Sequence, residues 1–149
     1  MSNAPAHARK LVHTESVRIR WGDMDAQVHV NNVEYFRYME VARIAFFETL
    51  GVRPGGSGLH PGAQPVIIST ACTYLRSLTF PGDVLVDVYL GEPGRSSVMT
   101  WYAMRTERDP GTVYAEGSAK LCWVGGEDRK AIPLPERIRN LLEQSPLPN

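Results

Sequence analysis

Hydrophobic and polar residues alternate strictly along one short stretch near the start of the chain. Val17, Ile19 and Trp21 are separated by Arg18 and Arg20. A period of two is typical of a strand with one buried face. We therefore predict a half-buried strand that leads into the loop beginning at Trp21.

Residues 33 to 50 carry the period of a helix. Polar residues recur every three positions and form one narrow stripe: Glu34, Arg37, Glu40 and Arg43. Apolar residues cover most of the remaining circumference, well beyond the roughly 100° stripe of a surface helix. Gly51 suits the position that ends such a helix. We expect one long helix that is mostly buried.

Four further strands are predicted beyond this helix. In the first, one face is shared by Val66, Ile68, Cys72, Tyr74, Leu78 and Phe80. In the last, alternate residues from Val113 to Trp123 face one way. Turns separate the strands at Pro81-Gly82-Asp83, at residues 91–94 and at Asp109-Pro110-Gly111. With a short helix after Pro135, this order predicts an α+β fold, a helix on one face of an antiparallel sheet.

The loop between the first strand and the long helix concentrates polar side chains. It contains Asp23, Asp25, His29, Asn31 and Asn32. These residues precede a helix N-terminus, where free backbone N–H groups and the helix dipole favour developing negative charge. A carboxylate beside such donors is what the hydrolysis of an acyl group requires. The loop is therefore the candidate catalytic segment.

Other interpretations of the loop are compatible with the sequence. Asp23 and Asp25 also suit helix capping or local loop hydrogen bonds, and His29 suits a structural hydrogen bond. The spacing partly fits an EF-hand, but Val28 occupies the glycine position and a strand precedes the loop. A transition-metal site would need a third strong ligand beside His29 and the two aspartates.

Further motifs extend this pattern along the chain. They are Gly22-Asp23-Met24-Asp25, His29-Val30-Asn31-Asn32, Tyr35, Phe80-Pro81-Gly82-Asp83, Glu116-Gly117-Ser118-Ala119 and the segment Arg129–Pro133. With these motifs the chain resembles the hotdog-fold acyl-CoA thioesterases of the 4-hydroxybenzoyl-CoA thioesterase-like type. The resemblance implies that Asp25 is the catalytic carboxylate. His29 also matches the plant fatty acyl-ACP thioesterases, whereas Gln27 and Val28 replace an Asn and a Gly of these families.

The resemblance also implies an architecture and an assembly. It implies a hotdog fold, in which a sheet of about five strands wraps around the long helix in a single domain over residues 14–149. Residues 1–13 are interpreted as a disordered lead-in. The active site is expected to form between two subunits of a homodimer or homotetramer.

The predicted reaction is hydrolysis of an acyl thioester, with Asp25 as general base or as nucleophile. The backbone N–H of Asn32 or Val33 would bind the thioester oxygen. The predicted catalytic set is thus Asp25, His29, Asn31, Asn32 and Val33, and Glu40 and Glu48 are alternative carboxylates on the helix. No metal or redox cofactor is required. The alternative function is a non-catalytic module that binds acyl-CoA or a lipid-like ligand.

The expected partner is acyl-CoA, or an acyl-ACP. Arginine binds phosphate through two parallel hydrogen bonds. The residues assigned to substrate binding are Asp23, Tyr35, Arg76, Arg95, Arg129 and Lys130.

Composition narrows the class of protein further. Sixteen basic and 16 acidic side chains give a formal net charge of zero, so no overall field attracts nucleic acid or an anionic membrane. No apolar run approaches the roughly 20 residues of a membrane span, and the N-terminus has no apolar signal segment. We expect a cytoplasmic protein without nucleic-acid or membrane partners.

Overall fold

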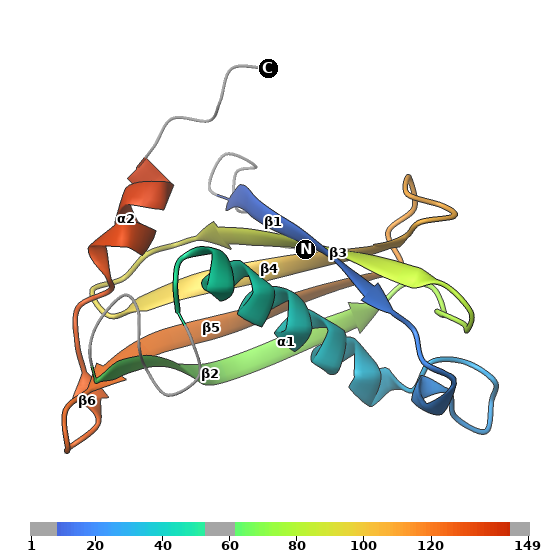
Figure 1. Cartoon of the computed structure of the whole chain (residues 1–149), viewed down its shortest axis with the longest axis horizontal. Helices are drawn as coiled ribbons and strands as arrows, with labels where there is room; N and C mark the ends of the chain where they lie inside the picture. Colours follow the sequence, from blue (N-terminus) through green and yellow to red (C-terminus); the bar gives the residue numbers. More distant parts are fainter. Residues whose placement is uncertain (1–8, 53–61, 144–149) are drawn as a thin grey trace.

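The computed structural model describes residues 9–52 and 62–143, in which an antiparallel sheet is combined with one long helix (Figure 1). The elements are β1 (Arg9–Arg18), the 3₁₀ turn η2 (Trp21–Asp23), α1 (Asn32–Thr49), β2 (Ala63–Tyr74), β3 (Asp83–Gly91), β4 (Ser97–Thr106), β5 (Ala115–Gly125), β6 (Lys130–Ala131) and α2 (Glu136–Glu143). The strand order is β1-β3-β4-β5-β2, and the short β6 pairs with β5. No helix in the described ranges is both long and apolar enough to span a membrane.

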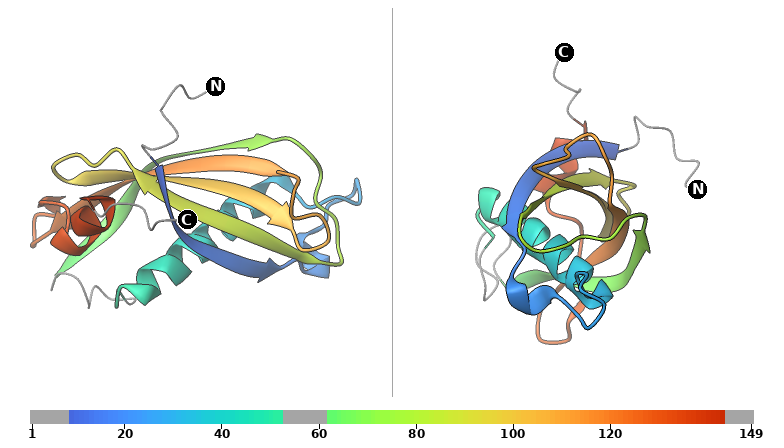
Figure 2. Two further views of the ribbon diagram at one scale, coloured as in Figure 1. Left: turned by 90° about the horizontal axis from the view of Figure 1, so that it is seen from above. Right: turned by 90° about the vertical axis from the view of Figure 1, so that its right-hand side faces the viewer.

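The sheet curls around α1, as the end-on view in Figure 2 shows. The inner face of the sheet and one side of α1 form the core, with Tyr38, Met39 and Phe46 of the helix almost fully buried. These features confirm the predicted hotdog fold and the α+β class. The two-residue β6 is a strand that the sequence did not predict.

The last long strand, β5, has the alternating faces that its sequence predicts. Ala115, Ala119, Leu121 and Trp123 are buried against the helix side. Gly117 belongs to the same face because a Cβ there would lie 2.1 Å from the Met39 Sδ. The missing side chain allows α1 to approach the sheet closely at this point.

The N-terminal prediction needs two corrections. β1 begins at Arg9, so residues 9–13 are strand rather than lead-in, and the rest of the predicted lead-in, residues 1–8, lies outside the described residues. A register shift between Leu11 and His13 interrupts the alternation, which explains why the sequence did not reveal this half of the strand. At the other end, β1 stops at Arg18, and Trp21 is 74% exposed in the 3₁₀ turn.

The strand after the helix was predicted too long. β2 ends at Tyr74, and its pairing with β5 shifts between Ile67 and Ser69. A single face from Val66 to Phe80 is therefore wrong, although Leu78 is buried in the connection that follows. Main-chain hydrogen bonds of that connection run to Tyr35, Val30 and Tyr114 instead of to a strand partner.

α1 is buried on one side only within a single chain. Val33, Val41 and Ile44 are exposed, and Ile67 and Ile68 are exposed on the neighbouring edge strand β2 (exposed apolar surface of α1 and β2). Arg43, which the sequence places in the polar stripe, is instead only 8% exposed. Among the described residues, the helix therefore has an exposed apolar surface beside a sheet edge that pairs with no further strand.

Candidate active site

The loop between β1 and α1 is closed by main-chain hydrogen bonds. The Asp25 N–H donates to the His29 carbonyl at 2.9 Å, and Met24 and Val30 form an antiparallel bridge. The Val30 N–H donates to the Leu78 carbonyl at 2.8 Å, which attaches the loop to the segment after β2. These bonds hold the loop in one position beside the start of α1.

Asp25 is exposed at the wall of a cavity of about 260 Å³. Its Oδ1 accepts a hydrogen bond from the Gln27 N–H at 2.9 Å, whereas Oδ2 has no partner among the described residues. The cavity is lined by Asp25, Gln27, His29, Val30, Asn32, Tyr35, Tyr74, Leu75, Arg76 and Ser77. One carboxylate oxygen is therefore available to water or to a ligand.

The first turn of α1 presents an available donor to the same cavity. Asn31 is the N-cap: its side chain accepts from the Val33 N–H at 3.4 Å, and its carbonyl accepts from the Glu34 N–H. The Asn32 N–H has no hydrogen-bond partner among the described residues. Of the two predicted oxyanion donors, Asn32 is free and Val33 is engaged by the cap.

Two tyrosines that contact each other fix this end of the cavity. The Tyr35 hydroxyl accepts from the Leu78 N–H at 3.0 Å and donates to the Arg76 carbonyl, so its bonds go to the protein. Burial raises the pKa of Tyr35. The Tyr74 hydroxyl donates to the Asn32 carbonyl at 3.1 Å and holds the start of α1 against β2. The sequence assigned Tyr74 only to a strand face, because nothing in its neighbours signals this long-range contact.

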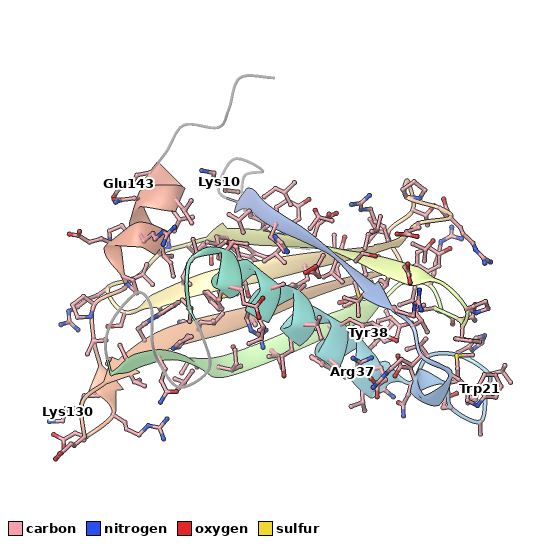
Figure 3. The ribbon with its side chains drawn as sticks, viewed as in Figure 1. Lys10, Trp21, Arg37, Tyr38, Lys130 and Glu143 are labelled. Carbon is pink, nitrogen blue, oxygen red and sulfur yellow. The ribbon has the colours of Figure 1, made fainter. Side chains whose placement is uncertain are left out.

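Asp23, which the sequence assigned to substrate binding, has a structural position and does not line the Asp25 cavity. Its side chain is 0% exposed, and its two oxygens accept hydrogen bonds from the Arg20 main chain and side chain, from Arg37 and from the Tyr38 hydroxyl. Burial alone would raise the pKa of this carboxyl, but bonds from Arg20 and Tyr38 and the charge of Arg37 hold it below its ordinary value. Figure 3 shows Arg37 and Tyr38 at the helix end nearest the Trp21 turn.

The four basic residues predicted to bind phosphate divide into two groups. Arg76 lines the Asp25 cavity. Arg95 lies in the β3–β4 connection, and Arg129 and Lys130 lie at β6, at the end of the molecule opposite the Trp21 turn, as the labelled Lys130 and Trp21 in Figure 3 show. Of these four residues, only Arg76 is close to the loop between β1 and α1 within one chain.

The metal-binding interpretations find no support in this geometry. The segment before Asp23 is a strand and a 3₁₀ turn, not the helix of an EF-hand, and the Asp23 carboxylate is fully occupied. In residues 9–52 and 62–143, no three His, Cys, Asp or Glu side chains are grouped in a way that could hold a metal ion. Glu40 and Glu48 are exposed on α1 and do not line the Asp25 cavity.

Val28 stands where the resemblance leads us to expect a glycine, and its backbone conformation shows what that position requires. Its φ angle is +63°, in the left-handed region that favours glycine. A β-branched residue is strained there. The glycine expected from the resemblance thus corresponds to a real conformational demand of the loop.

Comparison with known proteins agrees with this fold. Residues 19–142 match the family model of the thioesterase-like superfamily. The PA2801 protein of Pseudomonas aeruginosa, a proposed thioesterase, has 40% sequence identity and a TM-score of 0.84, with 89% of this chain and 99% of that chain covered. A proposed acyl-CoA thioesterase of Xanthomonas campestris has 33% identity and a TM-score of 0.67, over 76% and 93% of the chains. The DHNA-CoA thioesterase of Staphylococcus aureus shares the fold at 20% identity and a TM-score of 0.73, over 87% and 85%.

The chain belongs to the thioesterase-like superfamily, because the family model covers most of its length and includes the whole of the loop between β1 and α1 and all of α1. It is a thioester hydrolase with a hotdog fold.

Proposed function

We propose that the protein is an acyl-CoA thioesterase in which Asp25 is the catalytic carboxylate. One observation carries the proposal: Asp25, with one unbonded carboxylate oxygen, and Asn32, with an unbonded backbone N–H in the described residues, line one cavity at the N-terminus of α1. This combination supplies a base or nucleophile and an electrostatic partner for the oxygen of a tetrahedral intermediate.

In the proposed reaction, Asp25 Oδ2 removes a proton from water as the water attacks the thioester carbonyl, or attacks that carbonyl itself to give a mixed anhydride. The carbonyl oxygen gains negative charge and is stabilised by the Asn32 N–H and by the positive end of the α1 dipole. The thiolate leaves with little acid assistance because a thiol pKa is about 8.5. His29, exposed at the cavity wall, orients the substrate or the water.

The active unit is proposed to be a homodimer. β2 is a 12-residue edge strand, and it adjoins the exposed apolar surface of α1 and β2. Proteins rarely leave a long edge strand bare, and such apolar patches are typical of interfaces. Sedimentation should find twice the chain mass of 16.6 kDa. A species of 16.6 kDa alone at micromolar concentration contradicts this assembly.

A twofold dimer would bring together the basic residues that lie at opposite ends of a single chain. Its β2 strands run antiparallel, so the Tyr74 end of one lies near the Ala63 end of the other. Gly125 pairs with both Ala63 and Lys130. The second copy would therefore bring its Arg129 and Lys130 toward the first copy's Arg76, where together they bind CoA phosphates.

This assignment predicts a change in KM rather than in kcat. Alanine at Arg76, Arg95, Arg129 and Lys130 together should raise KM for acyl-CoA while kcat is little changed. An unchanged KM contradicts the assignment. The same measurement with acyl-ACP decides between the two carriers.

The decisive experiment is Asp25→Asn assayed on a panel of acyl-CoA thioesters with a thiol-trapping dye. Asn keeps the size of Asp and loses the basic oxygen, so kcat should fall by roughly 10²–10⁴-fold with KM little changed. Asp109→Asn is the matched control, because Asp109 is an exposed aspartate in the β4–β5 turn. If Asp25→Asn keeps more than about a tenth of the wild-type kcat, another carboxylate is catalytic. Binding of acyl-CoA by the wild type without turnover would favour the non-catalytic module.

A further inference from the structure

A second cavity follows the Asp25 cavity along the seam between α1 and β2. It has a volume of about 240 Å³ and is lined by Phe36, Met39, Glu40, Arg43, Ile67, Thr70, Tyr102, Ser118 and Ala119. Asn32 and Tyr74 line the first cavity, whereas Phe36, four residues after Asn32 in α1, and Thr70, four residues before Tyr74 in β2, line the second. A group that enters beside Asp25 and extends along this seam therefore meets the second cavity.

Arg43 is a buried cation in this second cavity. It is 8% exposed, and the one hydrogen bond of its guanidinium joins Nη1 to the Tyr102 hydroxyl oxygen at 3.1 Å. Within the described residues, no carboxylate oxygen lies within 4.0 Å of it. Its Nε and Nη2 make no hydrogen bond there, yet they are not among the fully enclosed atoms without a partner. These N–H groups therefore keep some contact with solvent, and Arg43 itself lines the cavity.

The guanidinium is held in place from beneath. Thr100 Oγ1 donates to the Ala119 carbonyl at 2.9 Å, so its only proton is used. The Tyr102 hydroxyl, 2.6 Å from Thr100 Oγ1, must then donate to Thr100 and accept from Arg43. A chain of buried bonds thus orients the Arg43 donors before any ligand binds, which lowers the cost of binding.

We propose that Arg43 recognises a hydrogen-bond acceptor oxygen at the distal end of the acyl group. The inference rests on the proposed thioesterase function, and it assigns the substrate class as acyl thioesters with a distal hydroxyl, keto or carboxylate oxygen. Arg43 follows Asn32 by 11 helical residues, or about 16 Å at ~1.5 Å per residue. The distal oxygen should therefore be separated from the thioester by most of the distance between Asn32 and Arg43.

The physical reason is the cost of an unsatisfied guanidinium. A purely alkyl chain that filled the cavity would remove water from the free N–H groups and return no acceptor. An acyl group with a distal oxygen also removes that water, but its oxygen accepts a hydrogen bond from the same N–H groups. Glu40 also lines the cavity but is exposed, so a carboxylate ligand meets one negative charge at the rim as well as Arg43. A hydroxyl or keto oxygen offers the same acceptor without that repulsion.

The test uses CoA thioesters of matched length that end in a methyl, a hydroxyl or a carboxylate group. Wild-type kcat/KM should be about 10- to 150-fold higher for at least one oxygenated substrate, the factor expected for one hydrogen bond to a charged group. Arg43→Met should remove this preference by lowering kcat/KM for the oxygenated substrate and not for the methyl one. Arg108→Met, at an exposed arginine of the β4–β5 turn, should keep the preference.

Binding to Asp25→Asn separates this inference from the proposed function. The dissociation constants of the three thioesters should show the same preference, and Asp25→Asn/Arg43→Met should lack it. Preference in binding without wild-type turnover would overturn the thioesterase proposal and keep the Arg43 inference. Equal kcat/KM and equal affinities for the three compounds would overturn the Arg43 inference alone. If Arg43→Met does not fold, Arg43→Lys and Tyr102→Phe replace it. Each should reduce the preference, and full retention in both would overturn the inference.

Discussion

The buried Asp23 carboxylate should be a main determinant of stability in the catalytic loop. Its oxygens accept five hydrogen bonds, three from Arg20 and one each from Arg37 and Tyr38, at 2.7–3.1 Å. In Asp23→Asn one oxygen becomes an NH₂ group. This group is a hydrogen-bond donor, and it would face the donor groups of Arg20, Arg37 or Tyr38. Whichever oxygen is replaced, at least two of the five bonds are lost.

The magnitude follows from those bonds. Hydrogen bonds to charged groups contribute about 1.5–3 kcal/mol each. Arg20 is 62% exposed and Arg37 33% exposed, so water recovers part of the loss on their side. We expect Asp23→Asn to lower the free energy of unfolding by about 2–4 kcal/mol. For a chain of this length that corresponds to a Tm decrease of about 5–15 °C.

Differential scanning calorimetry and urea denaturation measure this change, and Asp25→Asn is the matched control. Asp25 is exposed, so its substitution should change the free energy of unfolding by no more than about 0.5 kcal/mol. The two variants should therefore separate: Asp23→Asn loses stability, and Asp25→Asn loses turnover. A Tm of Asp23→Asn within about 1 °C of wild type, below the expected decrease, would refute the reasoning that these bonds stabilise the fold.

Three further predictions concern the same region. Because the pKa of the Asp23 carboxyl is lower in the folded state, its contribution is complete above the ordinary value of 3.8 and is lost as the pH falls below it. Urea midpoints of wild type and Asp23→Asn, compared from pH 7 to about pH 3, should therefore converge at low pH, and a constant difference contradicts this. Val28→Gly should raise the urea midpoint, since relief of about 1–3 kcal/mol of left-handed strain exceeds the glycine entropy cost of about 0.5–1 kcal/mol. A lower midpoint argues against strain at Val28. Tyr74→Phe removes the bond to the Asn32 carbonyl and should cost about 0.5–1.5 kcal/mol, with kcat falling more than KM rises if the start of α1 positions the oxyanion donor; steady-state kinetics check this.

Local pattern was sufficient for α1, for most of the strand positions and for the candidate catalytic loop, but it missed the first half of β1, the end of β2 and the short β6. The change from a period of two to a helical period predicted a strand, a loop and α1, because each period follows from backbone geometry alone. The alternation in β5 identified its buried face for the same reason. Asp25 became the candidate carboxylate because its setting, a carboxylate just before a helix N-terminus, can be recognised from consecutive residues.

Side-chain partners from distant parts of the chain were outside the reach of such patterns. Asp23 and Asp25 differ little in the sequence, but α1 packs so that Arg37 and Tyr38 enclose only Asp23. The helical stripe predicted an exposed Arg43, whereas the sheet curls over that side and covers it. Residues of β2 reach the active site through the pairing of β2 with β5.

The sequence by itself therefore determined the class of fold, the long helix and the carboxylate that we propose as catalytic, since these depend on neighbouring residues. The tertiary structure decided which aspartate is structural, that Tyr74 and Arg76 join the Asp25 cavity, and that Arg43 faces a second one. Those outcomes depend on how α1 packs against the curled sheet. That packing is set by the combined burial of many side chains, and no spacing of residues along the chain encodes it.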